Sequence, residues 1–283
     1  MDKKMNTEER LQYHPAYCDA TEAIFYRNRN ELTFQREVSL NTLPRRIDLL
    51  VIRKEGTVSI ENELGRIFRH YNLWEMKGPD AALNVSTYFD LMSYTYQYLA
   101  EYAPEADILD TSLTFLREKM PVELMSYFVK HGFEEEQRGD GLYRYRKAGH
   151  PDMQIIVISH HGVSPWYRIM AENAEEADLD ASEKLFMELP EELRRRTITV
   201  WEMMQAVNGD KNWEREEESM PTKMIFEELR NKDALIAAQN AEIMRDKVQL
   251  EEKDAQIKRD KDQLEQKDAR IRELEAMLEV ARS

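Results

Sequence analysis

Residues 47–52 read IDLLVI and residues 74–79 read WEMKGP, and these two stretches decide the fold. The first is an apolar run of strand length that contains one carboxylate, Asp48. A carboxylate in such a strand costs desolvation free energy unless it is paired or bound to a metal. In the second stretch Glu75 and Lys77 are two residues apart, so an extended strand would project both from one face. Asp48 and Glu75 are therefore predicted to meet across neighbouring strands.

The flanking patterns predict strands that alternate with helices. Helices are expected over residues 7–30, over 84–102 with Asn84 as N-cap, from Pro121 to Gly132, and over 167–207. Strands are expected over residues 34–40, 47–52, 57–60, 72–77, 111–116, 142–146 and 153–158. This order is typical of a mixed α/β layer fold, in which a mixed sheet is flanked by helices.

The sequence divides into three predicted segments: an α/β domain at 1–165, a helical extension with an acidic linker at 166–220, and a charged helix at 221–283. In the last segment one apolar residue recurs every seventh position, but the companion heptad position is polar or charged. A weak coiled coil through which the chain self-associates is therefore predicted. The recurring residues are Ile236, Ile243, Leu250, Ile257, Leu264, Ile271 and Leu278.

Composition limits the classes of function. The chain has 283 residues, one cysteine and six histidines, so a cysteine-rich zinc site is excluded. No apolar run is long enough to span a bilayer, and the first residues lack a secretory signal, so a cytoplasmic protein without a membrane partner is expected. The net charge is -15, yet residues 36–77 carry eight basic and six acidic side chains, a local surplus of two positive charges (8 − 6 = +2). A polyanionic partner such as DNA is therefore not excluded.

The predicted pair of carboxylates suits a hard divalent cation. Mg²⁺ and Mn²⁺ take oxygen ligands, and Asp48 and Glu75 are the predicted ligands. Lys77 would orient a water molecule or stabilise the charge that develops on a phosphate.

These motifs resemble a known family. An Asp on the second strand of a hairpin, followed by Glu-x-Lys on the next strand and a long helix, resembles the PD-(D/E)XK nuclease superfamily. The segments QREVSLNTLPRRIDLLVI, IENELGRIFRHYNLWEMKGPDAALN and YFDLMSYTYQYL are similar to its transposase-associated and recombination-promoting nucleases, over about residues 20–160. The resemblance implies a restriction-endonuclease-like core, Asp48 and Glu75 as metal ligands, Lys77 as the catalytic lysine, and hydrolysis of DNA phosphodiesters by a Mg²⁺-dependent endonuclease.

Several assignments around this site remain open. The segment 60–63 reads IENE, so Glu61 and Glu63 would also share a strand face near Asp48, with Glu63 as a supporting acid. Glu22 on the first helix is the preferred further acid and Glu37 is the second choice, while Tyr94 would line the site. Phosphate contacts are expected from arginines, whose guanidinium groups suit phosphate geometry. The candidates are Arg45, Arg46, Arg66 and Arg69.

Two classes of function compete for this sequence. The first is the active endonuclease described above. The alternative is a catalytically degenerate nuclease fold that binds DNA or assembles through its coiled coil.

Overall fold

The computed structural model describes residues 13–39, 46–53, 60, 62–137 and 140–209, together with separate positions between 227 and 267. The predicted strand at 57–60 and the linker after Gly209 lie outside these residues, apart from Ile60. The chain forms two compact units, residues 1–225 and 226–283. None of the helices in the described parts combines the length and the apolar character needed to cross a membrane.

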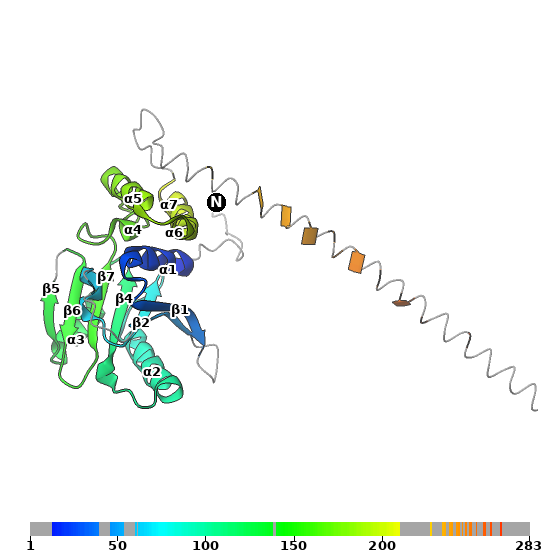
Figure 1. Cartoon of the computed structure of the whole chain (residues 1–283). Coiled ribbons are helices and arrows are strands. Elements are labelled where there is room, and N and C mark those ends of the chain that lie inside the picture. Colours follow the sequence, from blue (N-terminus) through cyan, green and yellow to red (C-terminus); the bar gives the residue numbers. More distant parts are fainter. Residues whose placement is uncertain are drawn as a thin grey trace, which may run out of the picture. The chain divides into compact units, whose positions relative to one another are not determined.

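Seven strands of the described chain form one mixed sheet in the order β1-β2-β3-β4-β7-β6-β5 (Figure 1). β3 runs parallel to β4 and β4 parallel to β7, and the other neighbours are antiparallel. The predicted mixed α/β architecture is therefore confirmed. The strands are β1 Leu32–Ser39, β2 Arg46–Arg53, β3 Tyr71–Lys77, β4 Thr111–Arg117, β5 Glu134–Gln137, β6 Leu142–Arg146 and β7 Asp152–Val157.

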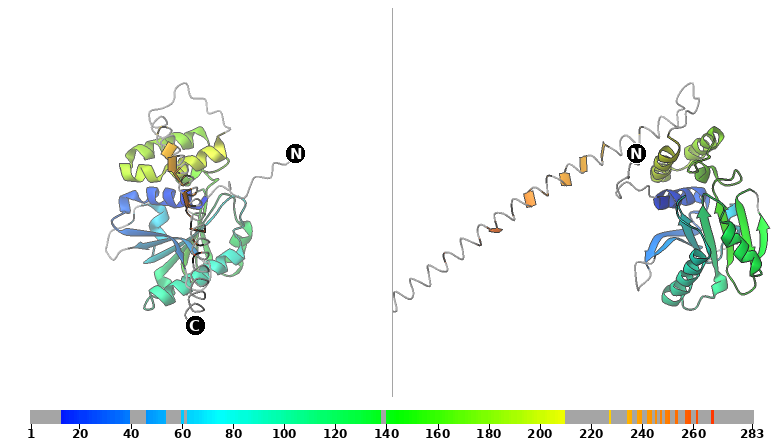
Figure 2. Two further views of the ribbon diagram at one scale, coloured as in Figure 1. Left: turned by 90° about the vertical axis from the view of Figure 1, so that its right-hand side faces the viewer. Right: turned by 180° about the vertical axis from the view of Figure 1, so that it is seen from behind.

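Helices cover both faces of the sheet (Figures 1 and 2). α2 and α3 lie on one face, and α1 lies on the other with the later helices stacked beyond it. The α-helices are α1 Tyr13–Ile24, α2 Val85–Tyr102, α3 Val122–Lys130, α4 Pro165–Arg168, α5 Glu176–Glu188, α6 Glu191–Arg196 and α7 Ile198–Asn208.

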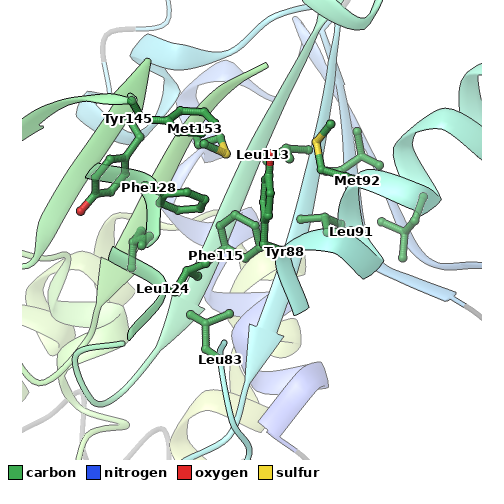
Figure 3. Packing of buried hydrophobic residues seen from close by; sticks show 14 of the residues in the cluster. Leu83, Tyr88, Leu91, Met92, Leu113, Phe115, Leu124, Phe128, Tyr145 and Met153 are labelled. Carbon is green, nitrogen blue, oxygen red and sulfur yellow. The ribbon is translucent and has the colours of Figure 1, made fainter. Parts of the chain in front are cut away.

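The main core lies between the sheet and the α2/α3 layer. Leu91 of α2 and Phe128 of α3 pack toward Leu113 and Phe115 of β4, and all four side chains are fully buried (Figure 3). Burial of an apolar side chain of this size contributes roughly 1.5–3 kcal/mol. This core fixes the strands that carry Asp48 and Glu75, because Leu50 and Leu73 belong to the same cluster.

The predicted N-cap of the long helix is confirmed. The Asn84 side chain accepts a hydrogen bond from the Thr87 N–H at 3.1 Å, and Thr87 Oγ1 contacts the Asn84 N–H in return. This capping box begins α2 seven residues after Lys77, so the helix starts beside the end of β3.

The strand that the IENE pattern predicts does not extend to Asn62 and Glu63. Glu63–Ile67 is a 3₁₀ helix, and the Asn62 side chain caps it by accepting a hydrogen bond from the Leu64 N–H. Asparagine readily makes this local hydrogen bond to the backbone, which favours a turn over continued strand pairing. Glu61 itself lies outside the described residues.

The second unit is described at separate positions, each of which is helical. Three of the predicted heptad residues are among them, and their exposed fractions are 62% for Ile243, 61% for Leu250 and 63% for Ile257. The other residues of the predicted repeat lie outside the described residues.

Candidate active site

Strand pairing brings Asp48 and Glu75 together. Leu49 of β2 pairs with Trp74 of β3, so the antiparallel register places Asp48 beside Glu75. Asp48 contacts His14 of α1, and Lys77 beside Glu75 is close enough to Tyr94 of α2 for that tyrosine to influence its pKa, so the pair lies at the end of the β2–β3 pairing within reach of both helices. The exposed fractions of Asp48 and Glu75 are 9% and 8%, so both carboxylates are largely shielded from water.

The Asp48 carboxylate is held by the backbone of β3. Asp48 Oδ2 accepts a hydrogen bond from the Met76 N–H at 2.7 Å, and Oδ1 lies 3.4 Å from His14 Nδ1. Burial raises the pKa of Asp48, while His14, the Met76 N–H and Lys77 oppose that rise. The carboxylate is therefore oriented by specific contacts.

Glu75 and Lys77 form a close pair at the end of β3. Lys77 Nζ lies 2.5 Å from Glu75 Oε1. Burial and the charge of Asp48 raise the pKa of Glu75 to about 6. Burial alone would lower the pKa of Lys77, but Glu75, Asp48 and Tyr94 outweigh it and the pKa is raised. The lysine is therefore a cation held against the two acids, and Tyr94 of α2 is close enough to influence its pKa.

Glu37 belongs to the same row of acids. Arg36 pairs with Leu49 and Val38 pairs with Ile47, so the register places Glu37 opposite Asp48. After burial, Glu37 is the other group that raises the pKa of Asp48. Its backbone has a φ of 47°, which is uncommon for a residue other than glycine. The second-choice acid is thus the one that the sheet places near Asp48.

Glu22, the preferred further acid, takes part in a different cluster. Arg36 Nη2 contacts both Asp19 Oδ1 and Glu22 Oε1 at 2.6 Å, and Arg196 Nη1 contacts Glu22 Oε2 at 2.6 Å. The Thr199 hydroxyl donates to Asp19 Oδ2 at 2.5 Å. These contacts join α1 to β1, α6 and α7, and both oxygens of Glu22 are engaged by guanidinium groups. The structure does not bring Glu22 to Asp48.

Two of the predicted phosphate-binding arginines lie away from the site. Arg66 pairs with Glu63 at 2.9 Å, and Arg69 pairs with Asp152 at 2.7 Å. Arg69 precedes β3 and Lys77 ends it, which separates them by roughly 25 Å along an extended chain. Arg46 begins β2, but its side chain and the whole of Arg45 lie outside the described residues.

Glu63 is also separate from Asp48. It contacts Arg144 Nη1 through Oε1 at 3.0 Å, and its carbonyl accepts a second hydrogen bond from Arg144. The Arg144 side chain is buried, so Glu63 serves to neutralise it. The rival assignment of Glu63 to the metal site has no geometric support.

His14 is a site residue that the sequence pattern did not reveal. It lies in the first turn of α1, where His14 Nε2 is 2.9 Å from the Met76 carbonyl oxygen and Nδ1 faces Asp48. The contact joins residues 62 positions apart in the chain, so no local spacing could have signalled it.

The side chains that meet at the site carry two carboxylates, one imidazole and one ammonium group. Within the described residues no group of three or more His, Cys, Asp or Glu side chains is arranged to hold a metal ion by itself. Two carboxylates would suit a cation that takes its remaining ligands from water or substrate, as Mg²⁺ usually does.

Comparisons of the chain with models of known protein families, with characterised proteins and with solved structures gave no match.

Proposed function

We propose that this protein is a metal-dependent DNA endonuclease. Its active site, formed by Asp48, Glu75 and Lys77, hydrolyses the phosphodiester bonds of DNA. The observation that carries the proposal is the convergence of these residues: two buried carboxylates lie on adjacent strands, and Lys77 Nζ is 2.5 Å from Glu75. The sequence pattern of Asp followed by Glu-x-Lys predicts this convergence. The resemblance to transposase-associated and recombination-promoting nucleases supplies DNA as the substrate and recombination as the setting.

The residues fit a hard divalent cation. Two buried carboxylates repel each other, and this repulsion contributes to the raised pKa of Glu75. A cation between them would remove that cost, and carboxylate oxygens are the ligands that Mg²⁺ and Mn²⁺ prefer. When bound, the cation would supply Lewis-acid polarisation of the phosphate and make water more acidic.

The chain's own residues have distinct roles in this proposal. Asp48, oriented by the Met76 N–H, and Glu75 would hold the cation. Lys77 would place its ammonium group against the phosphate oxygen on which negative charge develops, or against the attacking water. Its contact with Glu75 keeps the ammonium beside the acids before substrate arrives.

Cleavage of supercoiled plasmid in Mg²⁺ tests the proposal. The wild-type protein should cut, and the Asp48→Asn and Lys77→Ala variants and addition of EDTA should each abolish cutting. Glu63→Gln is the matched control, because it changes a carboxylate that neutralises Arg144 away from the site. If the folded wild-type protein binds DNA without cutting it in any divalent cation, the binding-module alternative replaces the nuclease.

A further inference from the structure

His14 makes two contacts that involve both nitrogens of its ring. Nε2 lies 2.9 Å from the Met76 carbonyl oxygen, and Nδ1 lies 3.4 Å from Asp48 Oδ1. The N–H of the same residue, Met76, donates to the other oxygen of Asp48. His14, Met76 and Asp48 therefore form one connected arrangement at the end of β3.

The Met76 carbonyl fixes the tautomer of a neutral His14. A carbonyl oxygen can only accept, so Nε2 must carry the hydrogen and donate it. The lone pair of the neutral ring is then on Nδ1, which faces Asp48. Histidines that bind metals commonly have this arrangement, in which the second ring nitrogen donates to a backbone carbonyl and orients the ring.

The distance between Nδ1 and Asp48 Oδ1 suits two ligands of one ion better than a direct hydrogen bond. It is 3.4 Å, whereas N–H···O bonds are about 2.7–3.2 Å long. Two ligand atoms at about 2.1 Å from a shared ion, with an angle of about 105° between them, are about 3.3 Å apart. The competing explanation is an ion pair between a protonated His14 and Asp48.

We propose that His14 Nδ1 is a metal ligand beside Asp48 and Glu75, and that the site therefore selects a first-row transition metal such as Mn²⁺ over Mg²⁺. This inference rests on the proposed function, because it assigns the cation of the same site. Imidazole nitrogen binds transition metals readily, whereas Mg²⁺ favours oxygen ligands. Glu75 is held by Lys77, so its carboxylate must turn from the ammonium group to complete the set of ligands.

Titration calorimetry of the full chain with MnCl₂ and with MgCl₂ tests the ligand role. In the wild-type protein Mn²⁺ should bind about tenfold or more tightly than Mg²⁺, and His14→Gln should reduce that ratio to about threefold or less while Mg²⁺ affinity changes little. Glutamine keeps an N–H for the Met76 carbonyl, so a role in positioning alone would leave the ratio intact. His161→Gln is the matched control, because His161 is exposed and pairs with Glu175, away from Asp48 and Glu75.

Electron paramagnetic resonance of bound Mn²⁺ provides a second readout that does not depend on activity. The wild-type spectrum should contain a nitrogen hyperfine coupling that changes on ¹⁵N-histidine labelling and is missing in His14→Gln. An unchanged ratio of affinities in His14→Gln, or a wild-type spectrum without nitrogen coupling, would overturn the inference.

The two proposals can fail separately. Mn²⁺ binding through His14 without plasmid cleavage would reject the endonuclease and keep the metal ligand. Cleavage that requires Asp48 and Glu75, with His14→Gln retaining the wild-type ratio of affinities, would reject the ligand and keep the endonuclease.

Discussion

Asp48 is buried in an otherwise apolar strand and is held there by one backbone N–H and by a histidine. Glu75 beside it is buried too, and Lys77 supplies a single ammonium group for the pair. Burial of carboxylates costs free energy unless their charge is compensated. The two buried carboxylates therefore destabilise the metal-free folded protein, and a bound cation would offset this effect.

The raised pKa of Glu75 predicts how stability changes with pH. The folded value is about 6 and the ordinary value is 4.5, so the folded state favours the protonated acid. The contribution of Glu75 to the free energy of unfolding of the metal-free protein should fall by about 2 kcal/mol as pH rises from about 4.5 through about 6. Mg²⁺ should then raise the melting temperature at about pH 7.5 and have little effect at about pH 5, because only the charged acid binds it.

Thermal melts at the two pH values, with and without Mg²⁺, measure this effect. Glu75→Gln should lose the Glu75 share of the dependence on pH and the response to Mg²⁺. Equal Mg²⁺ stabilisation of the wild-type protein at both pH values would contradict the assignment of Glu75.

Lys77 is predicted to act on the reaction more than on the binding of the cation. Lys77→Met keeps most of the side-chain length and removes the charge, so the cleavage rate should fall by about 10²–10³-fold. Calorimetry should show Mg²⁺ affinity unchanged or higher, because a positive charge has been removed from beside Glu75. A variant that loses Mg²⁺ binding together with cleavage would assign Lys77 a structural role instead.

At the scale of elements, the helices after β7 are joined to the sheet through a buried arginine. Arg168 of α4 is fully buried, donates to the Ile158 carbonyl at 2.9 Å and pairs with Asp178 at 2.9 Å. Loss of one partner from a buried ion pair leaves an uncompensated charge. Arg168 of α4 therefore links α5 to Ile158, the residue that follows β7.

Arg168→Met should lower the free energy of unfolding by about 3–5 kcal/mol in urea denaturation. Arg195→Met is the matched control: Arg195 pairs with Glu191 on the helix surface, and its loss should change stability by about 0.5 kcal/mol or less. Similar losses in both variants would show that the burial of Arg168 is not the source of its contribution.

The elements that were predicted well have strong local signals. Asn84 marks the start of α2 by its side-chain cap, and Ile47 to Ile52 form a strand by their β-branched and apolar run. β5 was missed because its sequence, EEEQ, has neither alternation nor apolar residues, and its pairing with β6 defines it as a strand. Tertiary pairing overrides weak local preference there.

The site was predictable only in part, for a related reason. The two-residue period of a strand puts Glu75 and Lys77 on one face, and neighbouring strands bring Asp48 beside them. The choice of Glu37 over Glu22 depends on Arg36 and Arg196, which reach Glu22 from other elements. His14 reaches the site by the packing of α1, which local sequence does not encode.

At the scale of the whole molecule, the site and the helices that hold it belong to the unit of residues 1–225. The second unit is described as exposed helical positions with Ile243, Leu250 and Ile257 uncovered. We propose weak self-association as its role, because one heptad position is apolar and its companion is charged.

A chain ending at residue 225 should therefore fold and keep cation affinity within about twofold of the full chain, because the ligands are all in the first unit. Circular dichroism melts and Mn²⁺ calorimetry would measure both. Failure of the shortened chain to fold would show that the second unit stabilises the first.

Anomalous X-ray diffraction from crystals of the protein soaked in Mn²⁺ would show directly whether Asp48 and Glu75 hold one cation between them. We expect an anomalous peak at about 2.0–2.6 Å from a carboxylate oxygen of each residue. Ordered Asp48 and Glu75 side chains with no peak between them, at a Mn²⁺ concentration that supports cleavage, would contradict this expectation.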